Sequence, residues 1–173
     1  IMKKLILLLL IPFFSLSQNF TELDISPMDK AHFSRQKKVA TITYSRPQLK
    51  GRDLNDIVKL NKIWRTGANE ANELLLYVDI EINNVVVPKG IYKIFTYPEE
   101  KEIIFIVSSS TKIFGGASAY NSDMDVLRFK VPKRKAIDSL EAFSIAFSNN
   151  EGQPKIHFGW EYMRFDIPFK ILN

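Results

Sequence analysis

The stretch Leu74-Leu-Leu-Tyr-Val-Asp-Ile-Glu-Ile82 places an aliphatic residue at every second position, at 74, 76, 78, 80 and 82. Successive side chains of a β-strand point to opposite faces of its sheet, so this run predicts a strand with one buried face. Asn83-Asn84 follows, and Asn tolerates a positive φ, which predicts a hairpin turn into Val85-Val86-Val87. The chain is therefore expected to be built from antiparallel strands.

Weaker forms of the same alternation extend outward from this stretch in both directions. Further strands are predicted over 39–45, 91–97, 103–107, 126–132, 143–148, 156–162 and 165–171. A switch of phase between Tyr162 and Phe165 predicts a bulge or a bend. Gly159, inside a strand pattern, predicts a bulge or a close backbone approach. Only the segment from Asp53 to Trp64 has helical spacing, which predicts one or two turns behind an Asp53 N-cap.

These elements predict an all-β fold. Eight or nine short antiparallel strands with one apolar face, and one short helix, are typical of an antiparallel β-sandwich, of which a jelly-roll-like arrangement is one form. A closed β-barrel is the alternative.

The N-terminal residues have the three-part pattern of a secretory signal. Lys3 and Lys4 precede an apolar run from Leu5 to Phe14, and Ser15-Leu16-Ser17 offers small residues before Gln18. We expect a signal peptide over 1–17, an extended arm over 18–36 and a single β-sandwich domain over 37–173. The protein is then exported, to the periplasm or beyond, with no transmembrane span after signal removal; an uncleaved anchor is the alternative.

Composition and charge exclude several classes of protein. The chain has 173 residues, is 46% apolar and 25% charged, and contains no Cys, which excludes a disulfide scaffold, a Cys zinc site and a thiol nucleophile. The net charge of +5 falls to +3 without the signal, too little to indicate nucleic acid. The basic run between Arg128 and Lys135 has no interleaved aromatic residues, so it is interpreted as a solvated face. We predict no nucleic-acid partner.

Metal and cofactor binding are not predicted either. Asn121 to Asp125 begins like a calcium loop, but Val126 stands where that loop needs Gly. His32 and His157 do not have the spacing of a metal pair. A hydrolase built on Ser and His would use His157 and a Ser that the sequence does not identify.

Loop-rich sequence on either side of the predicted helix carries the candidate ligand-binding residues. Arg guanidinium groups offer planar donor forks for carboxylate, phosphate or sulfate, and Trp stacks on sugars. The candidates are Tyr44, Arg46, Arg52, Trp64, Arg65, Asn69, Glu70 and, from a later loop, Tyr120. In the structural alternative, Arg65 pairs with Glu70 and Trp64 packs in the core.

Three functions follow from this loop region. The favoured one is a binding module for an anionic or polyhydroxylated ligand, because the sequence shows no nucleophile–base pair and no metal set. The first alternative is a small envelope hydrolase with Glu70 as acid or base. The second alternative is a structural or interaction protein without a small-molecule site.

Several strings resemble the bacterial domain-of-unknown-function family 2911. They are Tyr44-Ser-Arg-Pro with Lys50-Gly-Arg52, Trp64-Arg-Thr-Gly-Ala-Asn-Glu-Ala71, Pro88-Lys-Gly-Ile-Tyr92, Asp125-Val-Leu-Arg128 and Trp160-Glu161. The similarity extends over about residues 25–171. It implies an exported, β-rich protein of the kind found in Bacteroidetes-type bacteria, and it implies no established activity. Phe114-Gly115 departs from the Trp-Gly of many relatives.

Overall fold

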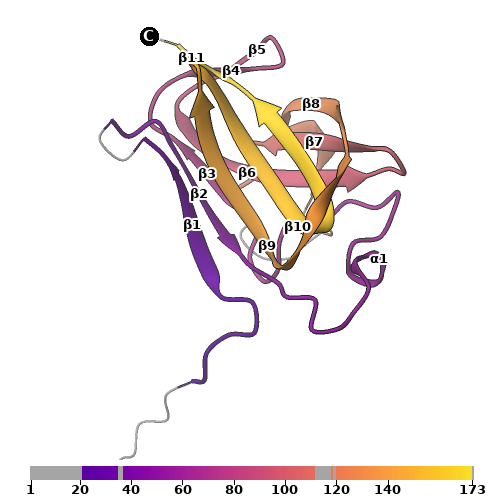
Figure 1. Ribbon diagram of the computed structural model, residues 1–173. Helices are drawn as coiled ribbons and strands as arrows, with labels where there is room; N and C mark the ends of the chain where they lie inside the picture. Colours follow the sequence, from indigo (N-terminus) through magenta and orange to yellow (C-terminus); the bar gives the residue numbers. More distant parts are fainter. Residues whose placement is uncertain (1–20, 35–36, 112–117, 119, 173) are drawn as a thin grey trace, which may run out of the picture.

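The computed structural model describes residues 21–34, 37–111, 118 and 120–172, so the predicted signal peptide over 1–17 lies outside the described residues. Figure 1 shows the elements that these residues form, which are mostly strands. They are β1 (Met28–Phe33), β2 (Ala40–Ser45), α1 (Leu54–Ile57), β3 (Glu73–Leu76), β4 (Ile80–Ile82), β5 (Val85–Val87), β6 (Gly90–Pro98), β7 (Glu102–Ser108), the 3₁₀ turn η2 (Ser122–Met124), β8 (Asp125–Pro132), β9 (Arg134–Asn150), β10 (Gln153–Pro168) and β11 (Lys170–Ile171).

The strands form three antiparallel sheets. The main sheet has the order β1-β2-β3-β6-β7-β8, β9 pairs with β10, and β4 lies between β11 and β5. The predicted all-β sandwich is confirmed, and the alternative of a closed barrel is wrong for the described residues. There are eleven strands in the described chain, more than the eight or nine predicted, partly because one predicted strand is divided.

That division falls within the stretch with the clearest alternation, 74–82. Leu74 and Leu76 lie in β3 of the main sheet, whereas Ile80 and Ile82 lie in β4 of the three-stranded sheet, and all four are buried. The prediction of one strand is therefore wrong, because inward and outward positions keep alternating while the backbone passes from one sheet to the next. The predicted Asn83-Asn84 turn joins β4 to β5, with φ of 50° and 62°.

The β9–β10 hairpin covers the inner face of the main sheet, and β10 turns back on itself near its middle (Figure 1). Phe158 stacks on Phe165 with ring centroids 4.6 Å apart, and the Phe169 N–H donates to the Pro154 carbonyl. The register shifts around Glu161, which confirms the bend expected in this part of the chain. A Cβ on Gly159 would lie 2.9 Å from the Arg164 and Leu140 side chains, so the predicted close approach is also confirmed.

The core lies between the main sheet and this hairpin. It includes buried Ile42, Leu74, Ile94 and Phe105 from the sheet and Phe143, Phe158, Trp160 and Phe165 from the hairpin. Strand β1 contributes Phe33, whose ring meets Phe169 edge-on, so the extended segment expected over 18–36 contains an edge strand of the main sheet. With no Cys in the chain, this apolar burial is the dominant stabilising term.

The short helix α1 and the loop that follows it lead into the candidate site. The predicted helix is confirmed as α1, where the Asp53 carboxylate accepts from the Asn55 N–H at 2.7 Å. The loop between α1 and β3 then runs back to the main sheet. Across the described residues, no helix is long and apolar enough to cross a membrane.

Candidate functional site

Trp64 anchors the loop between α1 and β3 to the main sheet. Its backbone exchanges two hydrogen bonds with Thr96 of β6, of 2.7 and 2.9 Å. Its ring is buried and stacked on Trp160 at 5.9 Å between centroids, and its indole N–H donates to the Gly67 carbonyl at 3.2 Å. Core packing, the structural alternative for Trp64, is therefore what the structure shows.

Buried polar groups between the loop and the main sheet fix the position of the residues that follow Trp64. Thr66 has a φ of 58°, and its hydroxyl donates to the Thr96 hydroxyl at 3.1 Å. The Asn72 amide donates to the Thr66 carbonyl, and its own Oδ1 is buried with no hydrogen-bond partner among the described residues. A Cβ added to Gly67 would lie 2.8 Å from this Oδ1, so the loop follows one narrow path.

A hollow of about 400 Å³, here named the Arg65 pocket, opens beside this loop. Arg65 is half-buried and forms no hydrogen bond or ion pair with any described residue. Arg52 also lines the pocket, and its guanidinium donates to the carbonyls of Leu49 and Gln48 at 2.9 and 2.7 Å. The full described lining is Ile25, Ser26, Pro47, Arg52, Ile57, Ile63, Trp64, Arg65, Gly67, Ala68 and Asn69, and it contains no carboxylate.

An acidic residue lies close to this lining. Asp24 accepts a hydrogen bond from the Asn69 amide at 3.0 Å and another from the Ser26 N–H at 2.6 Å. The bond from Asn69 holds the segment before β1 against the loop, and the bond from Ser26 fixes the Asp24 side chain within that segment. Asn69 itself has a φ of 54°, a conformation that Asn adopts more readily than most residues. Two distant parts of the sequence, the segment before β1 and the loop before β3, therefore meet at the wall of the pocket.

Arg46 and Tyr44, two other candidates, connect the two layers of the sandwich. Arg46 donates to Asp29 at 3.0 Å, to the Ser144 hydroxyl at 2.9 Å and to the Phe143 carbonyl at 3.1 Å. The buried Tyr44 hydroxyl bonds both backbone groups of Ile145, and burial raises the pKa of Tyr44. Neither residue lines the Arg65 pocket.

Glu70 stands apart from the pocket as well. It is half-buried, does not line the pocket and forms no ion pair with a described residue, so the Arg65–Glu70 pair of the structural alternative does not form. The loop therefore separates the cation from the carboxylate that the sequence placed five residues later.

Tyr120 lies on the outer face of the main sheet, where its ring meets Phe95 at 5.2 Å between centroids. Its hydroxyl donates to Asp125 at 2.6 Å and accepts from Arg128 at 3.0 Å. Burial and the neighbouring Asp125 raise the pKa of Tyr120 to about 12, and burial raises the pKa of Asp125. The Asp125 Oδ1 is buried without a partner among the described residues.

Sequence reasoning missed Asp125 and Arg128 as partners of Tyr120. The signal was the string Asp125-Val-Leu-Arg128 at the start of a strand, whose alternation placed Arg128 on the outer face. That Tyr120 would reach this strand depends on the path of the preceding turn. There the Asn121 side chain accepts from the Asp123 N–H.

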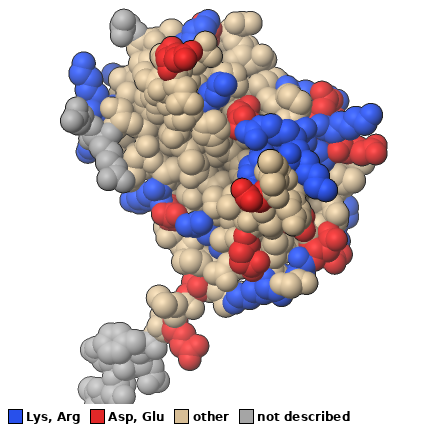
Figure 2. All heavy atoms as spheres, in the orientation of Figure 1, with Lys and Arg blue, Asp and Glu red and all other residues tan. Residues whose placement is uncertain are grey.

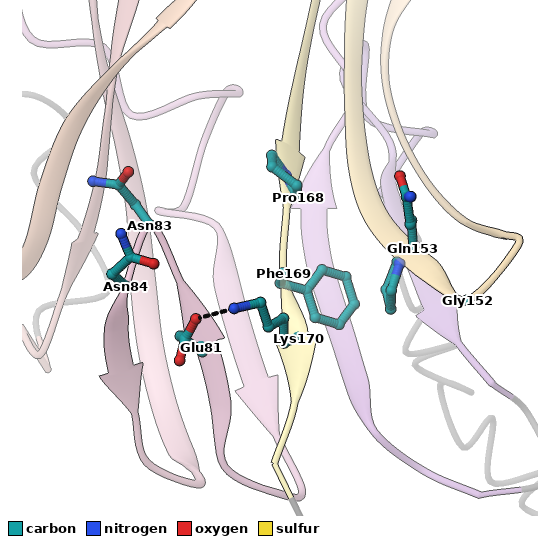
Figure 3. Close-up of a pocket in the computed structure, with 9 residues that line it drawn as sticks. Glu81, Asn83, Asn84, Gly152, Gln153, Pro168, Phe169 and Lys170 are labelled. Atoms are coloured by element: carbon teal, nitrogen blue, oxygen red, sulfur yellow. Dashed lines mark hydrogen bonds and ion pairs between the residues drawn. The ribbon is translucent and has the colours of Figure 1, made fainter.

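Two of the hollows larger than the Arg65 pocket lie elsewhere in the described chain. One, of about 560 Å³, lies where the β4–β5 turn, the β9–β10 turn and β11 meet, and Figure 3 shows the Glu81–Lys170 ion pair of 2.7 Å within it. The other, of about 600 Å³, is lined by Lys101, Lys133, Arg134 and Lys135 together with Glu100 and Glu161.

Figure 2 shows that Lys and Arg side chains gather on one part of the surface with Asp and Glu at their border. Lys130 and Arg134 are ion-paired, so the basic run is a mixed-charge surface.

The fold and this site define an antiparallel all-β sandwich with a cation-lined pocket formed by a loop that is anchored on the main sheet. The chain belongs to the family described as protein of unknown function (DUF2911), whose model matches residues 26–169. The match includes the loop residues from Trp64 to Ala71 and confirms the resemblance read from these strings. No curated protein and no solved structure matches the chain.

Proposed function

We propose that this protein is an exported cell-envelope binding module that takes a small anion, such as a carboxylate, phosphate or sulfate, in the Arg65 pocket. The observation that carries the proposal is the Arg65 side chain, which lines a 400 Å³ hollow and has no anionic partner among the described residues. A half-buried guanidinium without a partner keeps a planar fork of donors for a ligand.

The lining favours an anion over a sugar. Both Arg52 and Arg65 line the pocket, while Asp24 is engaged with Asn69 and Ser26 beside it. A sugar would need an open aromatic face, but one face of the Trp64 ring stacks on Trp160 and the residue as a whole is 8% exposed. Of the two ligand classes predicted from the sequence, anionic and polyhydroxylated, we therefore propose the anionic one.

The Glu70 hydrolase receives no support from this geometry. A general acid or base must reach the bound substrate, and Glu70 does not line the pocket that holds the cations. An interaction protein without a small-molecule site is the outcome that a failed binding experiment would favour.

Binding is tested by titrating the protein with inorganic phosphate and sulfate at constant ionic strength and recording the heat of binding and the thermal midpoint. Arg65→Gln removes the free cation and keeps much of the side-chain length, so we expect at least tenfold weaker binding, about 1.4 kcal/mol. Lys62→Gln, an exposed cation on the same loop outside the lining, is the matched control and should bind like the unaltered protein. Equal anion binding by both variants would refute the pocket.

Export is tested separately, by sequencing the N-terminus of the protein isolated from its native cells. The secretory pattern predicts a chain that begins at Gln18 and is found in the periplasm or the medium. A protein that retains residues 1–17 and stays in the cytoplasm would contradict this part of the proposal.

A further inference from the structure

Outside the Arg65 pocket, three polar side chains lie in a row across the outer face of the β9–β10 hairpin. The Ser148 Oγ lies 2.7 Å from the His157 Nε2, and the His157 Nδ1 lies 2.6 Å from the Asp166 Oδ1. The bend in β10 creates the row, because it brings Asp166 of the second half beside His157 of the first. We name these residues the Ser148 row.

The donor and acceptor roles in the row follow from chemistry. Burial alone would raise the pKa of Asp166, but hydrogen bonds from Arg134 and His157 outweigh it and lower the pKa. An ionised carboxylate only accepts, so the His157 Nδ1 carries the hydrogen. In the neutral ring Nε2 is then the acceptor, and the Ser148 hydroxyl donates to it. A hydroxyl held in this way is aligned to lose its proton to the imidazole.

The row lies beside a hollow of about 440 Å³ between the ends of β1 and β9. Its described lining is His32, Phe33, Ser34, Lys37, Val39, Phe147, Ser148, Asn149 and Ile171. The apolar members suit a small hydrocarbon group. His157 is one third exposed, so water also has access to the imidazole.

Backbone donors point to the same side as the hollow. Both backbone groups of Ile145 bond the Tyr44 hydroxyl of the main sheet, so they are directed away from β10. In an antiparallel pair this direction repeats at every second residue, which turns the N–H groups of Phe147 and Asn149 the same way. Pro154, which has no N–H, lies opposite Asn149 in agreement with this pattern. The N–H that follows a serine nucleophile is a common oxyanion donor.

From these contacts we propose that Ser148 is the nucleophile of an esterase site, with His157 as general base and Asp166 as its positioning partner, acting on carboxylic esters with a small apolar acyl group. The Ser148 oxygen attacks the ester carbonyl while its proton passes to the His157 Nε2. The C–O bond to the alcohol breaks, and the alcohol leaves with that proton. Water then gives a proton to the His157 Nε2 and attacks the acyl carbon. The bond between that carbon and the Ser148 oxygen breaks, and the proton passes from His157 to the serine oxygen, which frees the acid and restores the serine.

Arg134 sets the expected rate of this chemistry. Its guanidinium donates to the other oxygen of Asp166 at 2.6 and 3.2 Å. This cation neutralises part of the charge that would stabilise a protonated His157, so we expect slow turnover. Arg134→Gln leaves the Asp166 carboxylate free to stabilise the positive charge that His157 gains in the transition state, so we expect it to raise kcat while KM stays unchanged. A merely structural row would leave no kcat to raise.

The experiment treats the full chain with a fluorophosphonate probe, maps the labelled peptide by mass spectrometry and follows hydrolysis of 4-nitrophenyl butyrate. We expect label on Ser148 and a loss of hydrolysis of about 100-fold in Ser148→Ala and His157→Asn. Ser144→Ala, on the same strand and face without a histidine partner, is the matched control and should keep the activity.

Two results would overturn the proposal: equal labelling of Ser148 in folded and urea-unfolded protein, or unchanged hydrolysis in Ser148→Ala. If Ser148→Ala does not fold, the unaltered chain decides through the probe alone. Label on Ser148 that requires the folded state supports the site, and its absence refutes it. The outcome does not depend on anion binding, since Arg65→Gln leaves the Ser148 row intact.

Discussion

At the scale of single residues, Gly67 shows how tightly the loop of the Arg65 pocket is built. A Cβ at this position would lie 2.8 Å from the Asn72 Oδ1 and 3.1 Å from the Ser45 carbonyl oxygen. Asn72 is fully buried and holds the Thr66 carbonyl, so it has little room to move. We predict that Gly67→Ala lowers the free energy of unfolding by about 1–3 kcal/mol, as overpacking typically does.

Urea unfolding of Gly67→Ala measures this loss, with Gly90→Ala as the matched control. A Cβ on Gly90 meets only the Tyr92 side chain, at 3.4 Å, so that variant should unfold near the midpoint of the unaltered protein. Equal stability of the two variants would show that the loop can relax around a methyl group.

Asp166 gives a residue-scale prediction about pH. Its folded pKa is lowered from 3.8, so its carboxylate stabilises the fold above the unfolded pKa, and this contribution is lost as pH falls through the folded pKa. Asp166→Asn removes the titration. We predict that the stability difference between the unaltered protein and this variant is largest near neutral pH and shrinks below pH 3.8. Urea midpoints from pH 6 to pH 3 test it, and a difference that is independent of pH would contradict it.

At the scale of elements, the β4–β5 hairpin depends on two consecutive residues with positive φ, Asn83 and Asn84. A β-branched residue tolerates the left-handed region poorly, at a cost of about 1–2 kcal/mol. We predict that Asn84→Val destabilises the protein by about this amount, while Asn84→Gly leaves it as stable as before or slightly more so. Thermal unfolding compares the two, and equal losses would mean that the Asn side chain, not the backbone, matters.

The same elements show how far sequence patterns reach. Alternation identified β2 and β8 correctly, and it found the buried second half of β9 over 143–148, because these segments turn one face to the core. It missed the exposed first half of β9, and it divided β10 into two predicted strands. It misjudged 74–82, because a chain that changes sheets without changing phase leaves no mark in the pattern. It also indicated the bend in β10 by the phase switch after Tyr162, but not which residues the bend would bring together.

The candidate sites show the same limit: the sequence identifies residues that are close along the chain, but not residues that the fold brings together from distant strands. Arg52, Trp64, Arg65 and Asn69 line one pocket because they belong to one loop region, which composition alone can identify. Arg46 also stood in that region, but its partners Asp29 and Ser144 come from β1 and β9. The Ser148 row was missed for this reason: its serine and histidine had outward phase in the sequence, and only the folded hairpin places Asp166 beside them.

At the scale of the whole molecule, Arg46 and Arg65 have different roles: Arg46 stabilises the fold, and Arg65 is proposed to bind the anion. Arg46 joins the main sheet to Phe143 and Ser144 of β9. It also pairs with Asp29 of β1, whereas Arg65 has no partner among the described residues. We predict that Arg46→Gln lowers the free energy of unfolding by about 1–3 kcal/mol, since it loses charged hydrogen bonds between the layers, and leaves anion affinity unchanged. Arg65→Gln should do the opposite, with weaker binding and stability within about 0.5 kcal/mol of the unaltered protein. Urea unfolding and calorimetric titration of both variants test this. Anion binding that is lost with Arg46 at a temperature where the fold is intact would move the site to the junction of the two layers.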